Sequence, residues 1–279
     1  MAAKRKGGRL RPDMASFLGL GVAVGGILFG QHLEGGHVEQ LKGLSAALIV
    51  LGGTLGAVMV STPLQTLLRG FVRLKDVFFE RAQGHREMIE EIIEYATKAR
   101  RSGIVSLEND AAAIDDPFLR KALNLAVDGT DLQELRKMME LEIGLEEHRT
   151  ESEAKVYEAA GGYAPTIGII GAVIGLILVM HDLADIKKVG EGIATAFVAT
   201  IYGVGFANLF CLPAATKIKA RAHAEAEAKE LVLEGVIGIV EGLNPKIIRA
   251  KLESYLQEKP RGEQSGRTAR AGAPAQARG

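Results

Sequence analysis

Four long stretches of this sequence contain no Asp, Glu, Lys, Arg or His, and this feature restricts the possible folds more than any other. About 20 apolar residues form a helix that crosses a bilayer, whereas a surface helix of a soluble protein needs a polar face. The sequence therefore predicts an all-α, polytopic membrane protein with four transmembrane helices and a helical cytoplasmic domain. The stretches cover residues 14–30, 43–68, 163–180 and 192–216.

The charged residues fill the segments between and after these stretches, and they set the predicted domain boundaries. The order is a basic cytoplasmic N-terminus (1–13), transmembrane helices 1 and 2 (14–68), a cytoplasmic helical domain (69–162), transmembrane helices 3 and 4 (163–216), cytoplasmic C-terminal helices (217–258) and a disordered tail (259–279). A secretory signal peptide is the alternative for the first stretch. We do not favour it, because no small-residue cleavage site stands out and the second stretch follows closely.

The distribution of basic residues predicts the orientation. Cytoplasmic loops of membrane proteins carry an excess of Lys and Arg. Lys42 is the only strong base in residues 31–42, between the first two stretches. We therefore expect a multi-pass protein of the inner membrane with both termini in the cytoplasm. The cytoplasmic flanks carry Lys4, Arg5, Lys6, Arg9 and Arg11 before the first stretch, Arg69, Arg73 and Lys75 after the second, and Lys217, Lys219 and Arg221 after the fourth.

Capping signals predict helices in the cytoplasmic segments. Apolar residues recur at helical spacing over 72–101, and Gly103 is expected to end that helix. Asp116 before Pro117 predicts the start of a second helix, which stops at Gly129. A longer helix follows from a capping box at either Thr130 or Asp131 and leads into the third span. A final helix starts at Asn244-Pro245, with one side formed by Ile247, Ile248, Leu252 and Leu256. No segment alternates convincingly enough to predict a strand.

Patterns typical of enzymes and of cofactor sites are absent from the sequence. There is no phosphate-binding or dinucleotide-binding glycine loop and no Cys/His spacing for a metal. The formal net charge is zero, so nothing indicates nucleic acid as a partner. The single Cys211 lies inside an apolar stretch and is expected to be a packing residue. We expect no cofactor, no metal site and no enzymatic activity.

The spans also lack an ionisable residue, although proton transporters place such a group at membrane depth. Either the chain moves no protons, or a partner supplies the acidic group. The absence alone does not decide between these alternatives.

Several fragments resemble the MotA/PomA family of flagellar stator subunits over roughly residues 19–256. They include Gly25-Gly26 through Gln31, Glu34-Gly35-Gly36, the run from Leu51 to Ala57, Pro165-Thr-Ile-Gly168-Ile-Ile-Gly171-Ala172-Val-Ile-Gly175, Gly192 through Gly203, Leu212-Pro213 and Gly242-Leu-Asn244-Pro245. Each fragment alone is a weak signal. Their order, their spacing and the insertion between spans two and three together make the resemblance specific.

The resemblance implies a ring of subunits, pentameric in the family, around the helices of a MotB-like dimer. That partner carries the membrane aspartate and a peptidoglycan anchor. Ion flow would turn the ring against the rotor protein FliG, with protons as the expected ion. Two alternatives remain: an ExbB/TolQ-like proton-channel subunit that energises outer-membrane processes, against which the four spans argue, and a non-conducting membrane scaffold.

The resemblance also assigns residues to the ion pathway and its coupling to movement. Pro165 and Pro213 match two functional prolines, and Thr200 would face the partner's aspartate. Ala172 stands where sodium-driven relatives carry Thr, which favours protons. Without the resemblance, Pro165 near a helix start and Pro213 near a span end are positions where proline costs little. Thr200 would then only bond to its own helix.

Arg100, Arg101 and Glu108 match the charged rotor-contact residues of the family. The alternative is a solvated helix end, where basic residues also interact favourably with the helix dipole. The glycine pairs at four-residue spacing, in contrast, are expected to form close helix contacts. These pairs are Gly21 with Gly25, Gly26 with Gly30, and Gly171 with Gly175.

Overall fold

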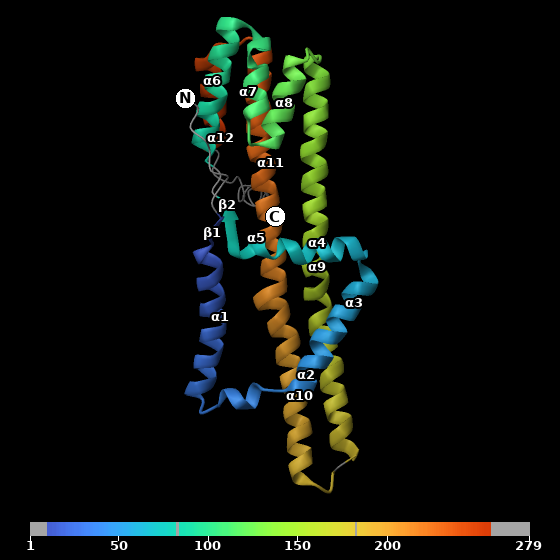
Figure 1. The fold of residues 1–279 in the computed structure, drawn as a ribbon. Coiled ribbons are helices and arrows are strands. Elements are labelled where there is room, and N and C mark those ends of the chain that lie inside the picture. Colours follow the sequence, from blue (N-terminus) through green and yellow to red (C-terminus); the bar gives the residue numbers. More distant parts are fainter. Residues whose placement is uncertain (1–9, 82–83, 182, 258–279) are drawn as a thin grey trace, which may run out of the picture. The chain divides into compact units, whose positions relative to one another are not determined.

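The computed structural model describes residues 10–81, 84–181 and 183–257. The predicted all-α class is confirmed, and Figure 1 shows the helices. The predicted tail at 259–279 and most of the basic N-terminus lie outside the described residues. The helices are α1 (Met14–Leu33), α2 (Leu44–Ala47), α3 (Gly53–Ser61), α4 (Leu64–Arg73), α5 (Lys75–Phe78), α6 (His85–Ser102), α7 (Glu108–Ala113), α8 (Pro117–Val127), α9 (Leu132–His181), α10 (Ile186–Phe206), α11 (Leu212–Val240) and α12 (Pro245–Gln257), with 3-10 helices η1 (Val38–Leu41) and η3 (Ile104–Leu107) and π-helices η2 (Leu48–Gly52) and η4 (Ala207–Cys211).

The chain divides into two compact units. The first, which we call the transmembrane unit, comprises Met1–Gln83 and Glu140–Glu227. The second unit comprises Gly84–Met139 and Ala228–Gly279. Four helical segments are long and apolar enough to cross a membrane, which confirms the predicted number. They are Met14–Leu33, Leu44–Ser61, Leu132–His181 and Ile186–Val240.

Helices α9 and α10 approach each other so closely that several glycines are required. A Cβ atom on Gly168 would lie 2.9 Å from the carbonyl oxygen of Ala199. A Cβ atom on Gly175 would lie 2.9 Å from the carbonyl oxygen of Gly192, and one on Gly203 would lie 2.5 Å from that of Ala164. Backbone contact of this kind suits helices in lipid, where packing replaces the hydrophobic driving force. The predicted contact role of Gly171 and Gly175 is confirmed.

The other two predicted glycine pairs, which lie in α1, form no such close contact. Nothing lies within 4 Å of a Cβ atom placed on Gly21, Gly25, Gly26 or Gly30, and α1 contains no buried residue. The prediction of close contacts was therefore wrong for α1 within this chain, because the helix is held mainly at its N-terminal end.

The second span covers one side of the α9–α10 pair. Ala46 and Val50 form a buried cluster with Val198 and Ala199 of α10. A Cβ atom on Gly53 would lie 2.8 Å from Cγ2 of Ile167 in α9. The other side of the pair is not covered by this span.

The second span is shorter than the predicted stretch over 43–68. It ends at Ser61, Pro63 follows, and α4 begins at Leu64 in a new direction that crosses the long helices of the transmembrane unit (Figure 1). Proline lacks the backbone N–H and restricts the preceding residue to extended conformations, which ends the helix. Helix α4 packs on α9, where the Tyr157 hydroxyl donates to the Gly70 carbonyl at 2.9 Å.

The helix predicted over 72–101 is interrupted, and the expectation of no strand was wrong. Strand β1 (Leu10–Pro12) pairs antiparallel with β2 (Phe79–Arg81), so that Arg11 lies opposite Glu80. Helix α6 begins only at His85. Strands of three residues are too short to show a recognisable alternation.

The cap predictions for the second unit are largely confirmed. The Asp116 carboxylate accepts from the backbone of Phe118 and Leu119 at 2.9 Å, and α8 ends at Val127. Of the two proposed caps for α9, Asp131 caps the helix, since it accepts from the Gln133 backbone at 2.9 Å. In α12, Ile248 and Leu252 are buried as expected, whereas Ile247 is 57% exposed and was wrongly assigned to that side.

Two glycines of α10 provide a matched test of the close helix contact. We expect Gly203→Ala to destabilise the transmembrane unit by about 1–3 kcal/mol, because its methyl group would collide with backbone of α9. Gly205 has open space at its Cβ position, so Gly205→Ala should be neutral or stabilise by up to about 1 kcal/mol. Thermal unfolding of the purified variants measures both effects. Equal melting temperatures would contradict the proposed backbone contact.

Candidate functional site

Three of the predicted pathway residues lie on one side of the α9–α10 pair. Ile167 of α9 and Val198 of α10 mark the side that the second span covers. At 100° per residue, Pro165 and Ala172 occupy the opposite flank of α9, and Thr200 occupies the opposite flank of α10. All three are partly exposed. The structure thus brings together residues from two spans on a side that the second span leaves uncovered.

The height of Thr200 along α9 follows from the glycine contact. A Cβ atom on Gly168 would lie 3.5 Å from the Thr200 Cα, so Thr200 is level with Gly168. Pro165 lies about one helical turn before this level, and Ala172 lies about one turn after it. The Thr200 hydroxyl donates to the Ala196 carbonyl at 3.2 Å, so it is engaged with its own helix. Its oxygen still has a lone pair that can accept a further hydrogen bond.

Pro165 lies deep inside α9, not near a helix start. A proline inside a helix removes the hydrogen bond to the carbonyl four residues earlier, here that of Gly161. Gly161 also packs closely, since a Cβ atom placed on it would lie 2.6 Å from Cδ2 of Leu212. The placement of Pro165 is therefore costly, and the alternative that it sits where proline costs little does not hold.

Pro213 lies apart from the other three residues. It follows Thr200 by 13 positions, about 20 Å along a helix, and its side chain is exposed. The π-helix η4 directly precedes α11, which contains Pro213. A π-turn shifts the helical register and is a common accommodation near proline and at functional sites. The buried Cys211 belongs to the same turn and packs as expected.

A cluster around Asp13, which the sequence analysis missed, holds the start of α1. The Asp13 carboxylate forms ion pairs with Lys217 and Arg221 of α11. Ser16 donates to the Val77 carbonyl at 2.9 Å, and Arg221 donates to backbone carbonyls of Asp76 and Phe79. The hydrogen bond from Lys217, together with the charge of Arg221, lowers the pKa of Asp13. This cluster ties three segments of the transmembrane unit together.

A second missed network joins α4 and α5 to α9. Arg73 donates to Glu153 at 2.7 Å, to Asp76 at 3.2 Å and to the Thr150 hydroxyl at 3.1 Å. Glu153 is 3% exposed. Burial opposes the charged form of Arg73, but the hydrogen bonds that it donates to Glu153 and Asp76 outweigh this effect and raise the Arg73 pKa. Partners separated by about 80 residues leave no signal in the sequence.

The predicted rotor-contact residues lie close together along the second unit. Arg100 and Arg101 are in the last turn of α6, and Glu108 is the first residue of α7. The turn between them uses Gly103, with a φ of 81°. All three side chains are exposed and form no ion pair with any described residue. Their charges are therefore available to a partner.

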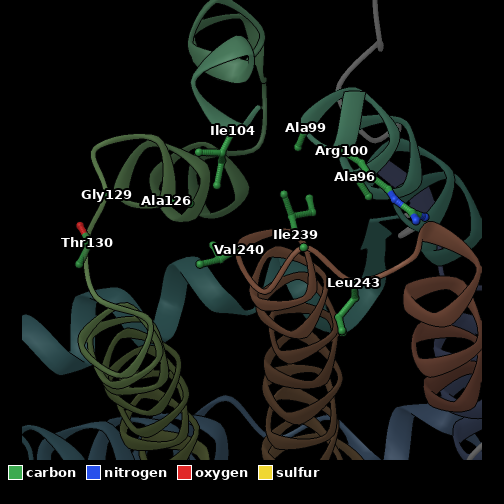
Figure 2. A pocket seen from close by; sticks show the side chains of 11 residues that line it. Ala96, Ala99, Arg100, Ile104, Ala126, Gly129, Thr130, Ile239, Val240 and Leu243 are labelled. Carbon is green, nitrogen blue, oxygen red and sulfur yellow. The ribbon is translucent and has the colours of Figure 1, made fainter. Parts of the chain in front are cut away.

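A cavity of about 400 Å³ lies beside Arg100 in the second unit (Figure 2). The ends of α6, α8 and α11 enclose it. Its lining is mainly apolar and consists of Ala96, Ala99, Arg100, Ile104, Ala126, Gly129, Thr130, Ile239, Val240, Gly242 and Leu243. Sequence analysis missed this cavity because its walls come from distant segments. Among the residues that the structure describes, no cluster of His, Cys, Asp and Glu could hold a metal ion.

Known proteins resemble this chain over nearly its whole length. The model of the MotA/TolQ/ExbB proton channel family matches residues 110–231. Motility protein A of Bacillus subtilis (strain 168) is 34% identical over 250 residues, which cover 89% of this chain and 93% of that protein. Chemotaxis protein PomA of Vibrio alginolyticus is 30% identical over 88% of this chain and 96% of its own length.

This chain belongs to the MotA/PomA family. The structural comparison agrees: a chain of the C. jejuni MotAB structure matches with a TM-score of 0.84 and 33% identity, covering 90% of this chain and 99% of that chain. A chain of the flagellar MotAB stator complex from Bacillus subtilis matches with a TM-score of 0.82 and 34% identity, and the match covers 88% of this chain and 96% of that chain. The MotA/PomA fold, with its four apolar helices, makes the chain a multi-pass membrane protein.

The lowered pKa of Asp13 predicts a specific loss of stability in acid. A carboxylate whose pKa is lowered by folding stabilises the protein above its unfolded value, here about 3.8, and loses this contribution as the pH falls through the folded value. We therefore expect the melting temperature of the wild type to fall more than that of Asp13→Asn between pH 5 and pH 3. Parallel curves for the two proteins would contradict the role of the Asp13 cluster.

Proposed function

We propose that this protein is the ring-forming A subunit of a flagellar motor stator, which couples proton flow across the inner membrane to torque on the rotor. The observation that carries the proposal is the match to MotA/PomA relatives and MotAB structures over about 90% of the chain. In this arrangement several copies form a ring, a pentamer as in the family, with both termini in the cytoplasm.

The partner of the ring supplies the acidic group that its spans lack. No Asp, Glu, Lys, Arg or His occurs in residues 163–180 or 192–216. Together with the match to MotAB structures, this supports a proton that crosses this part of the membrane on a carboxyl group of another chain, a MotB-like subunit that is also anchored to peptidoglycan. The uncovered side of the α9–α10 pair, with Pro165, Ala172 and Thr200, is the surface that this carboxyl group contacts.

The chemistry of this surface favours protons over Na⁺. Sodium needs several oxygen ligands to replace its water shell, and the Ala172 methyl group provides none. A proton needs only a chain of hydrogen bonds, and the Thr200 oxygen can take part in one. Pro165 frees a carbonyl at Gly161 and gives the helix a point at which its hydrogen bonding can change. Pro213, farther along, couples through the π-helix η4 and not through direct contact.

The charged residues of the second unit form the contact with the rotor protein, FliG in the family. Arg100, Arg101 and Glu108 are exposed and unpaired with described residues. Exposed ion pairs are individually weak, which allows them to form and break during rotation.

The two other candidate functions fit less well. An ExbB/TolQ-like subunit shares the proton channel family but would have three spans, whereas this chain has four candidate spans. A non-conducting scaffold would not explain an interior proline and a threonine aligned on the uncovered side of the pair.

A complementation experiment tests the proposed function and the ion. In a flagellated strain that lacks its stator A subunit, this chain produced with its own partner should restore swimming. A protonophore should abolish this swimming, because it removes the driving force, and removal of Na⁺ should leave it unchanged. Undiminished swimming under the protonophore in sodium medium would rule out proton coupling.

Two threonines of α10 allow a matched test of the pathway. Thr195 and Thr200 both bond to a carbonyl of their own helix, but Thr195 lies on the flank toward the second span. We expect Thr200→Val to slow rotation roughly three- to tenfold, the effect of one lost hydrogen bond of about 1 kcal/mol. Thr195→Val should rotate normally. The role of Thr200 is refuted if both variants, present at wild-type amounts in the membrane, rotate at wild-type speed.

A further inference from the structure

The cavity of the second unit has mainly apolar walls, which a purely electrostatic rotor contact does not require. Its floor is formed by Ala96, Ala126 and Ile239, which are buried. In Figure 2 the Ile104 and Ile239 side chains point into it from opposite sides. Water forms few hydrogen bonds with apolar walls. An open apolar cavity therefore favours an apolar group of a partner.

The mouth of the cavity is open because two helices end there with glycine. Gly129 follows α8 and Gly242 follows α11, with φ values of 75° and 69°, and both are exposed. Glycine is favoured at these positions because other residues rarely adopt a positive φ. The absence of side chains at both places leaves the entrance clear.

Arg100 places a positive charge at the edge of the cavity. Arg100 lines it, and Arg101 follows in the same helical turn. Several other basic residues of the second unit are paired, among them Lys98 with Asp110 at 2.5 Å and Arg136 with Glu234 at 2.7 Å. Arg249 likewise pairs with Glu90. Arg100 and Arg101 have no such partner among the described residues. The complementary surface therefore carries an apolar side chain and a carboxylate.

We propose that this cavity receives an apolar side chain of the rotor protein, presented next to a carboxylate that pairs with Arg100 or Arg101. The inference rests on the proposed function, because it takes the rotor protein as the partner. A cavity of about 150 Å³ already holds a benzene-sized group, so this volume accommodates Leu, Met or Phe. Buried apolar anchors dominate the affinity of protein interfaces, whereas exposed ion pairs mainly guide the approach.

Two substitutions test the anchor without changing charge. Ala99→Leu fills the cavity from α6, at a half-buried position. Val240→Thr conserves volume but places a hydroxyl in the wall. Their controls are Ala250→Leu, exposed on α12, and Val127→Thr, half-buried on α8, neither of which lines the cavity.

Each full-length variant is produced with its own partner in a strain that lacks its stator A subunit. The stall torque of single motors and the amount in the membrane are measured.

We expect stall torque to fall about fivefold or more in Ala99→Leu and Val240→Thr, with normal amounts in the membrane and normal torque in both controls. Torque equal to that of the controls would overturn the anchor while leaving the proposed function intact, because the wild type still drives rotation. Failure of the wild type itself to restore rotation would overturn the stator assignment, and the anchor with it. If Ala99→Leu does not reach the membrane, the isosteric Val240→Thr decides the question.

Discussion

The backbone contact between α9 and α10 is the constraint on which the transmembrane unit depends. In lipid, two helices gain nothing from hydrophobic association, so close packing must hold them. The glycines at 168, 175, 192 and 203 allow carbonyl oxygens of one helix to lie against the backbone of the other. This contact fixes the relative height of the two helices. It therefore sets Thr200 between the levels of Pro165 and Ala172, and a single side chain in the interface would shift all three.

The parts of the fold that follow from composition and local spacing could be predicted from the sequence. Uncharged stretches gave the four spans, and Asp116 and Asp131 gave the starts of two helices. The break at Pro63 was missed because the uncharged stretch over 43–68 continues on both sides of this proline. Composition alone therefore does not separate the second span from α4. The β1–β2 pair was missed because three residues carry no periodic pattern.

The candidate site likewise has features that the sequence predicts and features that only the structure shows. Pro165 and Ala172 are seven residues apart, so helical periodicity places them on one flank. Their alignment with Thr200 needed the register between two helices, which only the structure provides. Long-range pairs are out of reach of spacing arguments: Arg73 with Glu153 and Asp13 with Arg221 are 80 and 208 residues apart. The cavity beside Arg100 is built from three helix ends and is equally invisible in the sequence.

The magnitudes of these interactions limit how a proton step can move the protein. One charge crossing about 100 mV releases about 2.3 kcal/mol. Breaking the half-buried pair of Arg73 with Glu153 leaves the buried carboxylate without its partner and costs up to about 3–5 kcal/mol, and separating α9 from α10 would cost the contacts along their glycine-packed stretch. Under the proposed function, a single proton therefore cannot pull α9 from α10 or from α4. These helices move together as a rigid body, and the change occurs where they contact the partner and the rotor.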